Sequence, residues 1–203
     1  MKNIAIFCSG KGTNLQAIIN ASGRRKLNAN ISLVISDRQD SFSLTRAKRA
    51  GIEALFIDPE RFGTRTGFEK EIMRNLKKHS IDLIVLAGFM RMLSPGFVKR
   101  YRNRILNIHP ALLPSFKGTS GIKDALDYGV KITGPTVHFV DEGMDSGPII
   151  LQSAVKVRDV ETEESLARRI HAKEHIIYPE AIRLVLEGKL KIAGRRVILK
   201  NGD

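Results

Sequence analysis

The sequence predicts an α/β protein built on a doubly wound, mostly parallel sheet, with antiparallel strands added in its C-terminal part. Short apolar segments alternate with amphipathic segments through residue 108, and a glycine-rich loop joins the first of them to the second. Strands that alternate with helices imply right-handed crossovers and a parallel sheet. After Tyr128, two apolar segments are joined by a turn too short to hold a helix, which indicates antiparallel pairing.

The N-terminal part shows the signals of parallel strands and of helices that cover them. The run at 83–86 is continuously apolar, as in a strand buried on both faces. Phe68, Ile72 and Leu76 lie on one face of a helix, and Ser41 and Gly51 flank another helix as N-cap and terminator. Strands are expected at 3–8, 31–35, 54–57, 83–86 and 104–108, and helices at 15–21, 41–50, 68–79 and 95–101.

The C-terminal part follows a different pattern. Strands are expected at 136–140 and 149–157, and a long amphipathic helix at 162–186 in which Pro179 introduces a kink. Residues 190–199, interrupted at Gly194, predict a closing hairpin. With no linker or repeat in view, we expect a single domain over residues 1–203.

Composition narrows the functional class. The only cysteine, Cys8, excludes a disulfide framework and indicates a reducing compartment. No apolar run is long enough to span a bilayer, and the N-terminus enters a strand without a signal-peptide pattern. We therefore expect a cytoplasmic protein without a membrane partner.

The net charge of +13 raises the alternative of a nucleic-acid-binding module. The basic residues are dispersed, and no aromatic residues interleave with them as stacking platforms. A solvated basic surface is the favoured interpretation, with no nucleic-acid partner. The sequence leaves both a monomer and a homodimer open.

Candidate catalytic groups lie between residues 105 and 148. Asn107 and His109 are two apart at the end of an expected strand, so they point to the same face, where open α/β sheets place ligands. Asp145 follows the strand at 136–140 in a turn rich in glycine. A carboxylate can orient and charge a histidine, and an amide beside that imidazolium can hold an oxyanion. The alternative is a hydrogen-bonded turn with no chemistry.

The loop of residues 9–14, Ser-Gly-Lys-Gly-Thr-Asn, lies between a strand and a helix. Free backbone N–H groups and the helix dipole at such a position favour phosphate. Gly10 and Gly12 supply only half of a dinucleotide fingerprint, because Leu15 replaces its third glycine. A tight turn that needs glycine is an equally good explanation from the residues alone.

A helical segment carries a pattern of metalloproteases, with His171, Glu174 and His175 in the form H-x-x-E-H. Two histidines four apart can share a zinc ion, but a third ligand is needed, and no histidine or cysteine follows His175. The alternative is a helix with one histidine facing outward and one packed.

Four ordered blocks resemble the glycinamide ribonucleotide formyltransferase family: residues 9–16, 86–91, 106–110 and 145–149, with 174–179 extending the similarity over nearly the whole chain. The resemblance implies a Rossmann-like formyltransferase fold. It implies transfer of the formyl group of 10-formyltetrahydrofolate to the amine of glycinamide ribonucleotide, in purine biosynthesis and without a metal. The N-terminal part, about 1–100, would form the substrate-phosphate side, and about 101–203 the catalytic and folate side.

The same resemblance assigns residues to roles. It implies that Asn107, His109 and Asp145 form the catalytic trio, and that Gly12, Thr13 and Asn14 bind the substrate phosphate. Glu174, Ile108 and Pro110 would contact the ribose and glycinamide. The folate site it implies consists of Met90, Arg91, Met92, Leu93, Val140, Asp141, Glu142, Gly143 and Met144.

The sequence departs from the family at three positions. Ser120 and Ile122 replace histidines common in relatives, and His171 replaces a Lys or Gln, which leaves details of substrate contact open. Methionyl-tRNA formyltransferase and formyltetrahydrofolate hydrolase are the rival activities. Each carries an additional domain, C-terminal or N-terminal respectively, that this sequence is not expected to contain.

Overall fold

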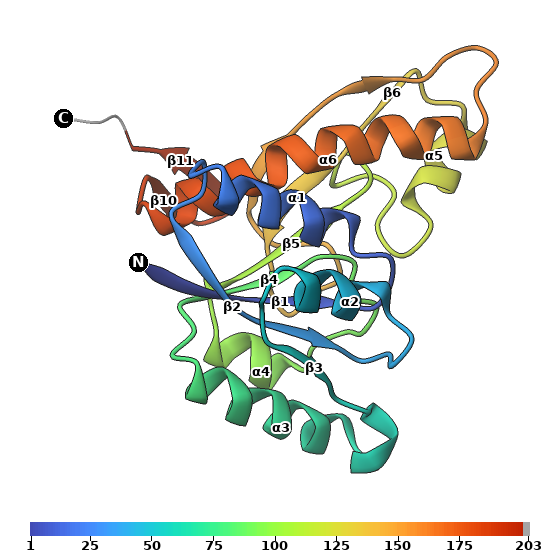
Figure 1. Ribbon diagram of the computed structural model, residues 1–203. Coiled ribbons are helices and arrows are strands. Elements are labelled where there is room, and N and C mark those ends of the chain that lie inside the picture. The colour runs from blue at the N-terminus through green and yellow to red at the C-terminus, as the bar shows by residue number, and fades with distance from the viewer. Residues whose placement is uncertain (201–203) are drawn as a thin grey trace.

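A nine-stranded sheet forms the centre of the molecule in the computed structural model, which describes residues 1–200 (Figure 1). The strand order is β10-β11-β8-β7-β5-β4-β1-β2-β3, and β6 and β9 form a separate two-stranded sheet. The strands are β1 (Lys2–Cys8), β2 (Ala29–Ser36), β3 (Ala54–Phe56), β4 (Leu83–Leu86), β5 (Ile105–His109), β6 (Ile132–Thr133), β7 (Thr136–Phe139), β8 (Ile149–Gln152), β9 (Val155–Lys156), β10 (Leu190–Ala193) and β11 (Arg196–Leu199).

The N-terminal half of the sheet is parallel, as predicted. Strands β3, β2, β1, β4 and β5 pair in parallel in that spatial order. The chain builds outward from β1 to β3, then returns to the other side of β1 to begin β4. Ligands of open α/β sheets bind at such a reversal, beyond the carboxyl ends of the strands. The glycine loop after β1 and the segment 87–93 after β4 both leave the sheet there.

Helices cover both faces of this half (Figure 1). Alternate residues of β1 explain why: Ile4 and Ile6 join one buried cluster with α1 and α6, whereas Ala5 and Phe7 join another with α3 and α4. Ala47 of α2 belongs to the α1 side. The helices are α1 (Thr13–Gly23), α2 (Phe42–Arg49), α3 (Arg65–Lys78), α4 (Pro95–Arg100), α5 (Gly121–Tyr128) and α6 (Glu163–Leu186).

Antiparallel strands complete the sheet, which confirms the expected change of pattern after Tyr128. Strand β7 pairs antiparallel with β5 and with β8, and β10 and β11 form the closing hairpin. The prediction of one strand at 149–157 was wrong, because β8 and β9 pair in different sheets. The chain turns between them as Ser153 donates its N–H to the Pro135 carbonyl. Gly134 lies so close that a Cβ there would be 1.9 Å from the Ser153 carbonyl oxygen.

Two helical elements were not predicted. Helix α5 and the short 3₁₀ helix at Pro59–Phe62 are only eight and four residues long, too short for a clear helical period. Helix α6 continues through Pro179 without a break in the helix. Among residues 1–200, no helix has the length and hydrophobicity needed to cross a bilayer.

Candidate active site

Strand β5 carries Asn107 and His109 to its carboxyl end, as predicted. In the antiparallel ladder with β7, Asn107 lies opposite His138 and His109 lies opposite Thr136. The side chain of His109 is only 3% exposed. The register of this ladder therefore places two histidines and an amide at one site.

Asp145 completes the cluster from the turn that follows β7. Its backbone has φ 46°, and its Oδ2 accepts from the Gly118 N–H at 2.9 Å. The same oxygen lies 3.4 Å from His109 Nδ1, and Oδ1 accepts from Asn107 Nδ2 at 3.4 Å. Burial acts to raise the pKa of Asp145, but hydrogen bonds from His138 and the Gly118 N–H, with the nearby histidine charges, hold that pKa below its ordinary value.

Each ring nitrogen of His109 faces a hydrogen-bond acceptor. Nε2 lies 2.7 Å from the carbonyl oxygen of Phe116, which can only accept a hydrogen bond, so Nε2 carries a proton. Nδ1 faces the Asp145 carboxylate, which is also an acceptor. Because only imidazolium has a donor on both nitrogens, the charged ring satisfies both partners.

His138 is a site residue that the sequence analysis missed. Its Nδ1 lies 2.8 Å from the carbonyl oxygen of Phe139 and therefore donates to it. In the neutral ring Nε2 accepts from Asn107 Nδ2 at 3.2 Å, whereas in the charged ring it can donate to Asp145 Oδ1, 3.6 Å away. The sequence shows a histidine in an expected strand, but only the β5–β7 register reveals that it faces Asn107.

A cavity of about 250 Å³ opens beside this cluster of Asn107, His109, His138 and Asp145. Its lining contains Asn107, His109, His138 and Asp145 together with two segments, the loop after β4 and the loop after β7. Ile108 and Pro110 line this cavity. So does every residue predicted to bind folate, namely Met90, Arg91, Met92, Leu93, Val140, Asp141, Glu142, Gly143 and Met144.

One wall of the cavity is held by a network that the sequence analysis also missed. Asp37, with a side chain 5% exposed, accepts from Ser9 Oγ at 2.6 Å and from Arg91 Nε at 2.9 Å. Ser9 Oγ in turn accepts from the Met90 N–H at 2.9 Å. A buried carboxylate at the end of β2 thereby fixes the backbone and the guanidinium of the loop after β4.

Backbone conformation and packing both require glycine at position 12 of the glycine loop. Gly12 precedes α1 with φ 67°, a left-handed conformation. A Cβ on Gly12 would lie 2.8 Å from Ser43 Cβ and 3.0 Å from Ser43 Cα on α2. Both observations require glycine for packing, so the need for glycine is not by itself a sign of phosphate binding.

Glu174 joins the glycine loop to α6. Its Oε2 accepts from Asn14 Nδ2 at 2.8 Å and lies 3.0 Å from His171 Nδ1. The hydrogen bond to Glu174 raises the pKa of His171, whose side chain is 46% exposed. Asn14 Oδ1 is buried without a partner within residues 1–200. Gly12, Asn14 and Glu174 lie outside the lining of the cavity beside His109, and Thr13 lines a groove elsewhere.

The H-x-x-E-H helix does not gather a metal cluster. Within the part of the chain that the structure describes, no group of three or more histidine, cysteine or carboxylate side chains is placed to hold a metal. The carboxylate of Glu174 is engaged by Asn14 and His171, and His175 Nε2 is buried without a partner. Burial lowers the pKa of His175.

Known proteins are similar over most of the chain. Residues 2–182 match the model of a family described as formyl transferase. Trifunctional purine biosynthetic protein adenosine-3 of Gallus gallus is 46% identical over 189 residues, which cover 93% of this chain and 19% of that protein. Phosphoribosylglycinamide formyltransferase of Escherichia coli (strain K12) is 40% identical over 190 residues, 94% of this chain and 90% of that one. The crystal structure of glycinamide ribonucleotide transformylase 1 from Symbiobacterium toebii superimposes with a TM-score of 0.97 at 49% identity, covering 99% of this chain and 95% of that chain.

Proposed function

Because this chain belongs to the formyl transferase family, we propose that it transfers the formyl group of 10-formyltetrahydrofolate to the amine of glycinamide ribonucleotide. The products are formylglycinamide ribonucleotide and tetrahydrofolate, in de novo purine biosynthesis. The chain spans about a fifth of the Gallus gallus relative, so the proposal concerns this one step. The observation that carries it is the convergence of Asn107, His109 and Asp145 on one cavity.

In the proposed reaction the amine nitrogen of the substrate attacks the formyl carbon, and the formyl oxygen becomes an oxyanion. The His109 imidazolium donates to that oxygen through Nε2, in place of the Phe116 carbonyl that it contacts without ligand. Phe116 has φ 52°, in the left-handed region that bulky side chains rarely adopt, so its loop is strained. A donor released to a developing negative charge accelerates the step that forms it.

Asn107 and Asp145 complete the chemistry. The Asn107 amide donates to His138 Nε2 at 3.2 Å and to Asp145 Oδ1 at 3.4 Å. The hydrogen bond to Asp145 is the longer of the two and the easier to redirect to the oxyanion. Asp145 accepts the amine proton through a water molecule and returns it to the folate nitrogen as the carbon–nitrogen bond breaks. Its lowered pKa keeps the carboxylate ionised at neutral pH, as a proton acceptor requires.

The two substrates enter from different sides of the site. Apolar side chains line the cavity that reaches His109, and they suit the ring system of the folate. They are Met90, Met92, Leu93, Val140 and Met144. On the other side, the N–H groups at Gly12, Thr13 and Asn14 suit a phosphate. Glu174 Oε1 forms no hydrogen bond within residues 1–200, and Asn14 Oδ1 has no partner there. Both oxygens are acceptors for ribose hydroxyls.

Acceptor competition tests the proposal. Purified protein and 10-formyltetrahydrofolate are incubated with glycinamide ribonucleotide, with initiator methionyl-tRNA, or without an acceptor, and the formylated products and formate are quantified. We expect formyl transfer to glycinamide ribonucleotide alone, and no loss of rate with excess EDTA. Formylated methionyl-tRNA, or formate released equally fast without acceptor, would identify a different formyl-transfer activity.

A further inference from the structure

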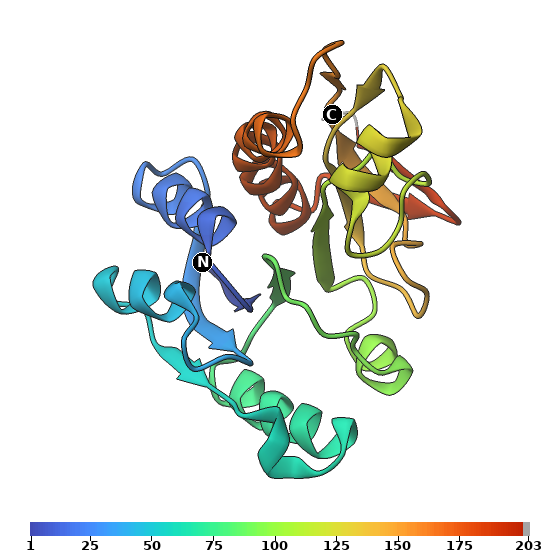
Figure 2. The same cartoon turned by 90° about the vertical axis from the view of Figure 1, so that its right-hand side faces the viewer.

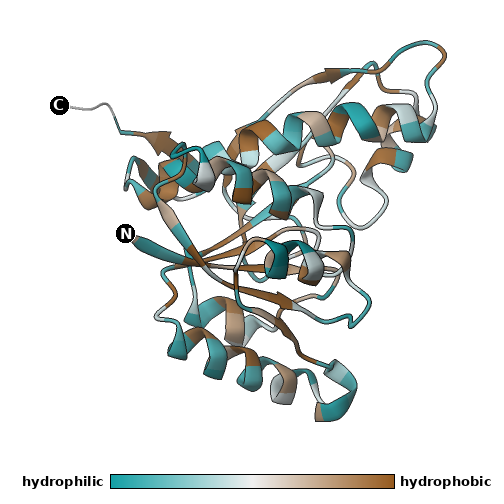
Figure 3. Cartoon of the chain, in the orientation of Figure 1, coloured by the Kyte–Doolittle hydropathy of each residue, from teal (hydrophilic) through white to brown (hydrophobic). Residues whose placement is uncertain are grey.

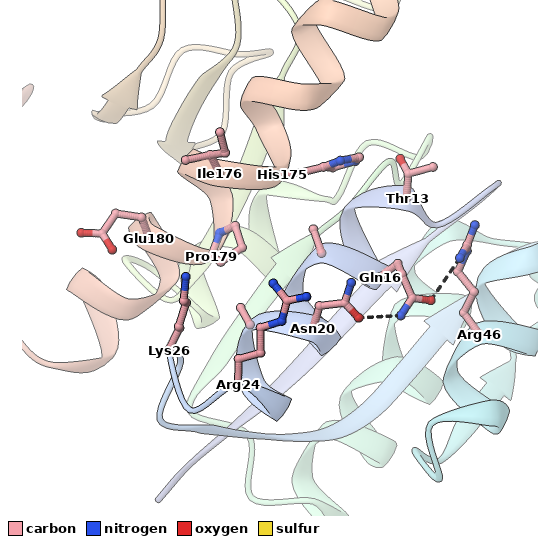
Figure 4. A pocket seen from close by; sticks show the side chains of 12 residues that line it. Thr13, Gln16, Asn20, Arg24, Lys26, Arg46, His175, Ile176, Pro179 and Glu180 are labelled. Atoms are coloured by element: carbon pink, nitrogen blue, oxygen red, sulfur yellow. Dashed lines mark hydrogen bonds between the residues drawn. The ribbon is translucent and has the colours of Figure 1, made fainter.

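A second cavity lies away from the catalytic cavity, between α1 and α6. It has a volume of about 560 Å³, within the usual range for small-molecule sites, and no residue lines both cavities. Figure 4 shows a row of polar side chains along one side of it, running from Arg46 through Gln16 and Asn20 to Arg24 and Lys26. Thr13, at one end of the groove, is the only lining residue that the proposed reaction also uses.

The groove carries positive charge that no neighbouring group neutralises. Arg24 and Lys26 form no ion pair within residues 1–200, and both are exposed to solvent. Arg46 donates to the Lys11 carbonyl at 2.9 Å and to Gln16 Oε1 at 3.0 Å, two uncharged acceptors. Three cations lining one concave surface concentrate anions there.

The single carboxylate in the lining does not offset that charge. Glu180 is bound by Arg183 through two hydrogen bonds of 2.7 and 2.9 Å, which hold the pKa of Glu180 below its ordinary value. In Figure 4 its carboxylate points away from Lys26. The groove therefore presents a net positive charge to a ligand.

The opposite wall is apolar. Ile176, 65% exposed, and Pro179 project from α6, and Ala17 and Ala21 belong to α1. At the end near Thr13, the buried Nε2 of His175 has no hydrogen-bond partner within the described residues. An unpaired buried nitrogen gains a hydrogen bond if a ligand reaches it. The groove thus combines cations, an apolar face and an unused polar atom.

We propose that this groove binds a nucleotide, with its phosphates between Arg24, Lys26 and Arg46 and its base against Ile176 and Pro179. Planar guanidinium groups suit phosphate oxygens, and a flat base suits an apolar face with few polar groups. The site does not depend on the proposed reaction, because Arg24, Lys26, Ile176 and Pro179 have no role in that reaction and do not line the cavity beside His109.

Calorimetric titration of the full chain with ADP tests the site. The variant Arg24→Ala/Lys26→Ala removes two phosphate contacts and is expected to weaken ADP binding about 10- to 100-fold, because both lost contacts are charge-assisted and both are partly screened by solvent. The matched control is Lys77→Ala/Lys78→Ala, which removes the same charge from exposed positions on α3. We expect the control to bind ADP as the original protein does.

Further titrations separate the parts of the ligand. Ile176→Ser should weaken ADP binding and leave pyrophosphate binding unchanged, and adenosine should bind more weakly than ADP. Saturation with glycinamide ribonucleotide should leave ADP binding in place. No ADP binding at millimolar concentration, equal loss in both charge variants, displacement by glycinamide ribonucleotide, or tighter binding of a DNA oligonucleotide than of ADP would each overturn the proposal.

Discussion

Replacing Asp145 by asparagine removes one negative charge from the catalytic cluster and preserves its size. The carboxylate lies 3.4 Å from His109 Nδ1, and the two side chains are 11% and 3% exposed. For unit charges at that distance and an effective dielectric constant of about 20, the attraction is about 5 kcal/mol. Removing one partner of a buried pair typically costs about 3–5 kcal/mol. Asp145→Asn would therefore leave His109 Nδ1 without its carboxylate partner.

Asp145 attracts the His109 imidazolium both before the reaction and in the transition state. Only the difference between these two attractions changes the rate. We expect kcat for formyl transfer to fall about 100- to 1,000-fold in Asp145→Asn, the range seen when one group that stabilises an oxyanion is lost. The KM values for both substrates should change little, because the glycine loop and the apolar side chains that line the cavity are unchanged. Steady-state kinetics measure both quantities, and circular dichroism checks the fold. Asp127→Asn, in exposed α5, is the matched control.

The pH dependence of stability supplies a second check. Because the pKa of Asp145 in the folded protein is lowered, its ionised form stabilises the fold above the unfolded pKa of about 3.9, and this contribution is lost as the pH falls through the folded value. The difference in Tm between the original protein and Asp145→Asn should therefore shrink below about pH 4. A variant with near-normal kcat under saturating substrates would refute the reasoning about His109 and Asp145.

Three further predictions concern other parts of the molecule. Gly12→Ala should lower the free energy of unfolding by at least about 1 kcal/mol in urea titrations, because Gly12 has a positive φ and an added Cβ would contact Ser43. Gly10→Ala is the control and should be nearly neutral, because a Cβ at that position meets nothing within 4 Å. Glu174→Gln should lower the pKa of His171 in an NMR titration and raise the KM for glycinamide ribonucleotide about 10-fold or more. Because the pKa of His171 is raised in the folded protein, its ion pair with Glu174 stabilises the fold below pH about 6.5 and less as the pH rises through the folded value. Equal effects of the substitution on Tm at pH 6 and pH 8.5 would contradict this prediction. Cys8, whose pKa burial raises to about 12, should resist iodoacetamide at pH 8.5 in the native protein and react in urea, and rapid labelling of the folded chain would show that β1 opens.

The parallel half of the fold could be predicted because its local signals agree. Apolar runs such as 83–86 report burial on both faces, and the same residues form the strand in the structure. Helix α5 escaped prediction because eight residues give too little periodicity. The division between β8 and β9 depends on contacts of Gly134 and Ser153, which lie 19 residues apart in sequence and touch only after folding.

The candidate site also contains residues that the sequence could predict and residues that it could not. Asn107 and His109 could be singled out because their spacing on a strand is a local property. His138 could not, because its role rests on a pairing register set by two whole strands. The support of Arg91 by Asp37 and Ser9 escaped for a similar reason, since these residues come from the ends of different strands. The motif resemblance pointed to the residues that line the cavity after β4 and β7, but not to the hydrogen bonds that hold Arg91 and Met90 in place.

The bond between Asn14 and Glu174 joins residues 160 positions apart. During synthesis, the glycine loop leaves the ribosome early, whereas α6 is completed only at Leu186. Tyr178 on the same helix donates to the carbonyls of Leu86 and Leu106, so α6 also ties β4 to β5. A growing chain can therefore form the first parallel strands long before its substrate side is complete. Until the last helix emerges, the apolar cluster on one face of the sheet lacks Tyr178, Ala181 and Ile182.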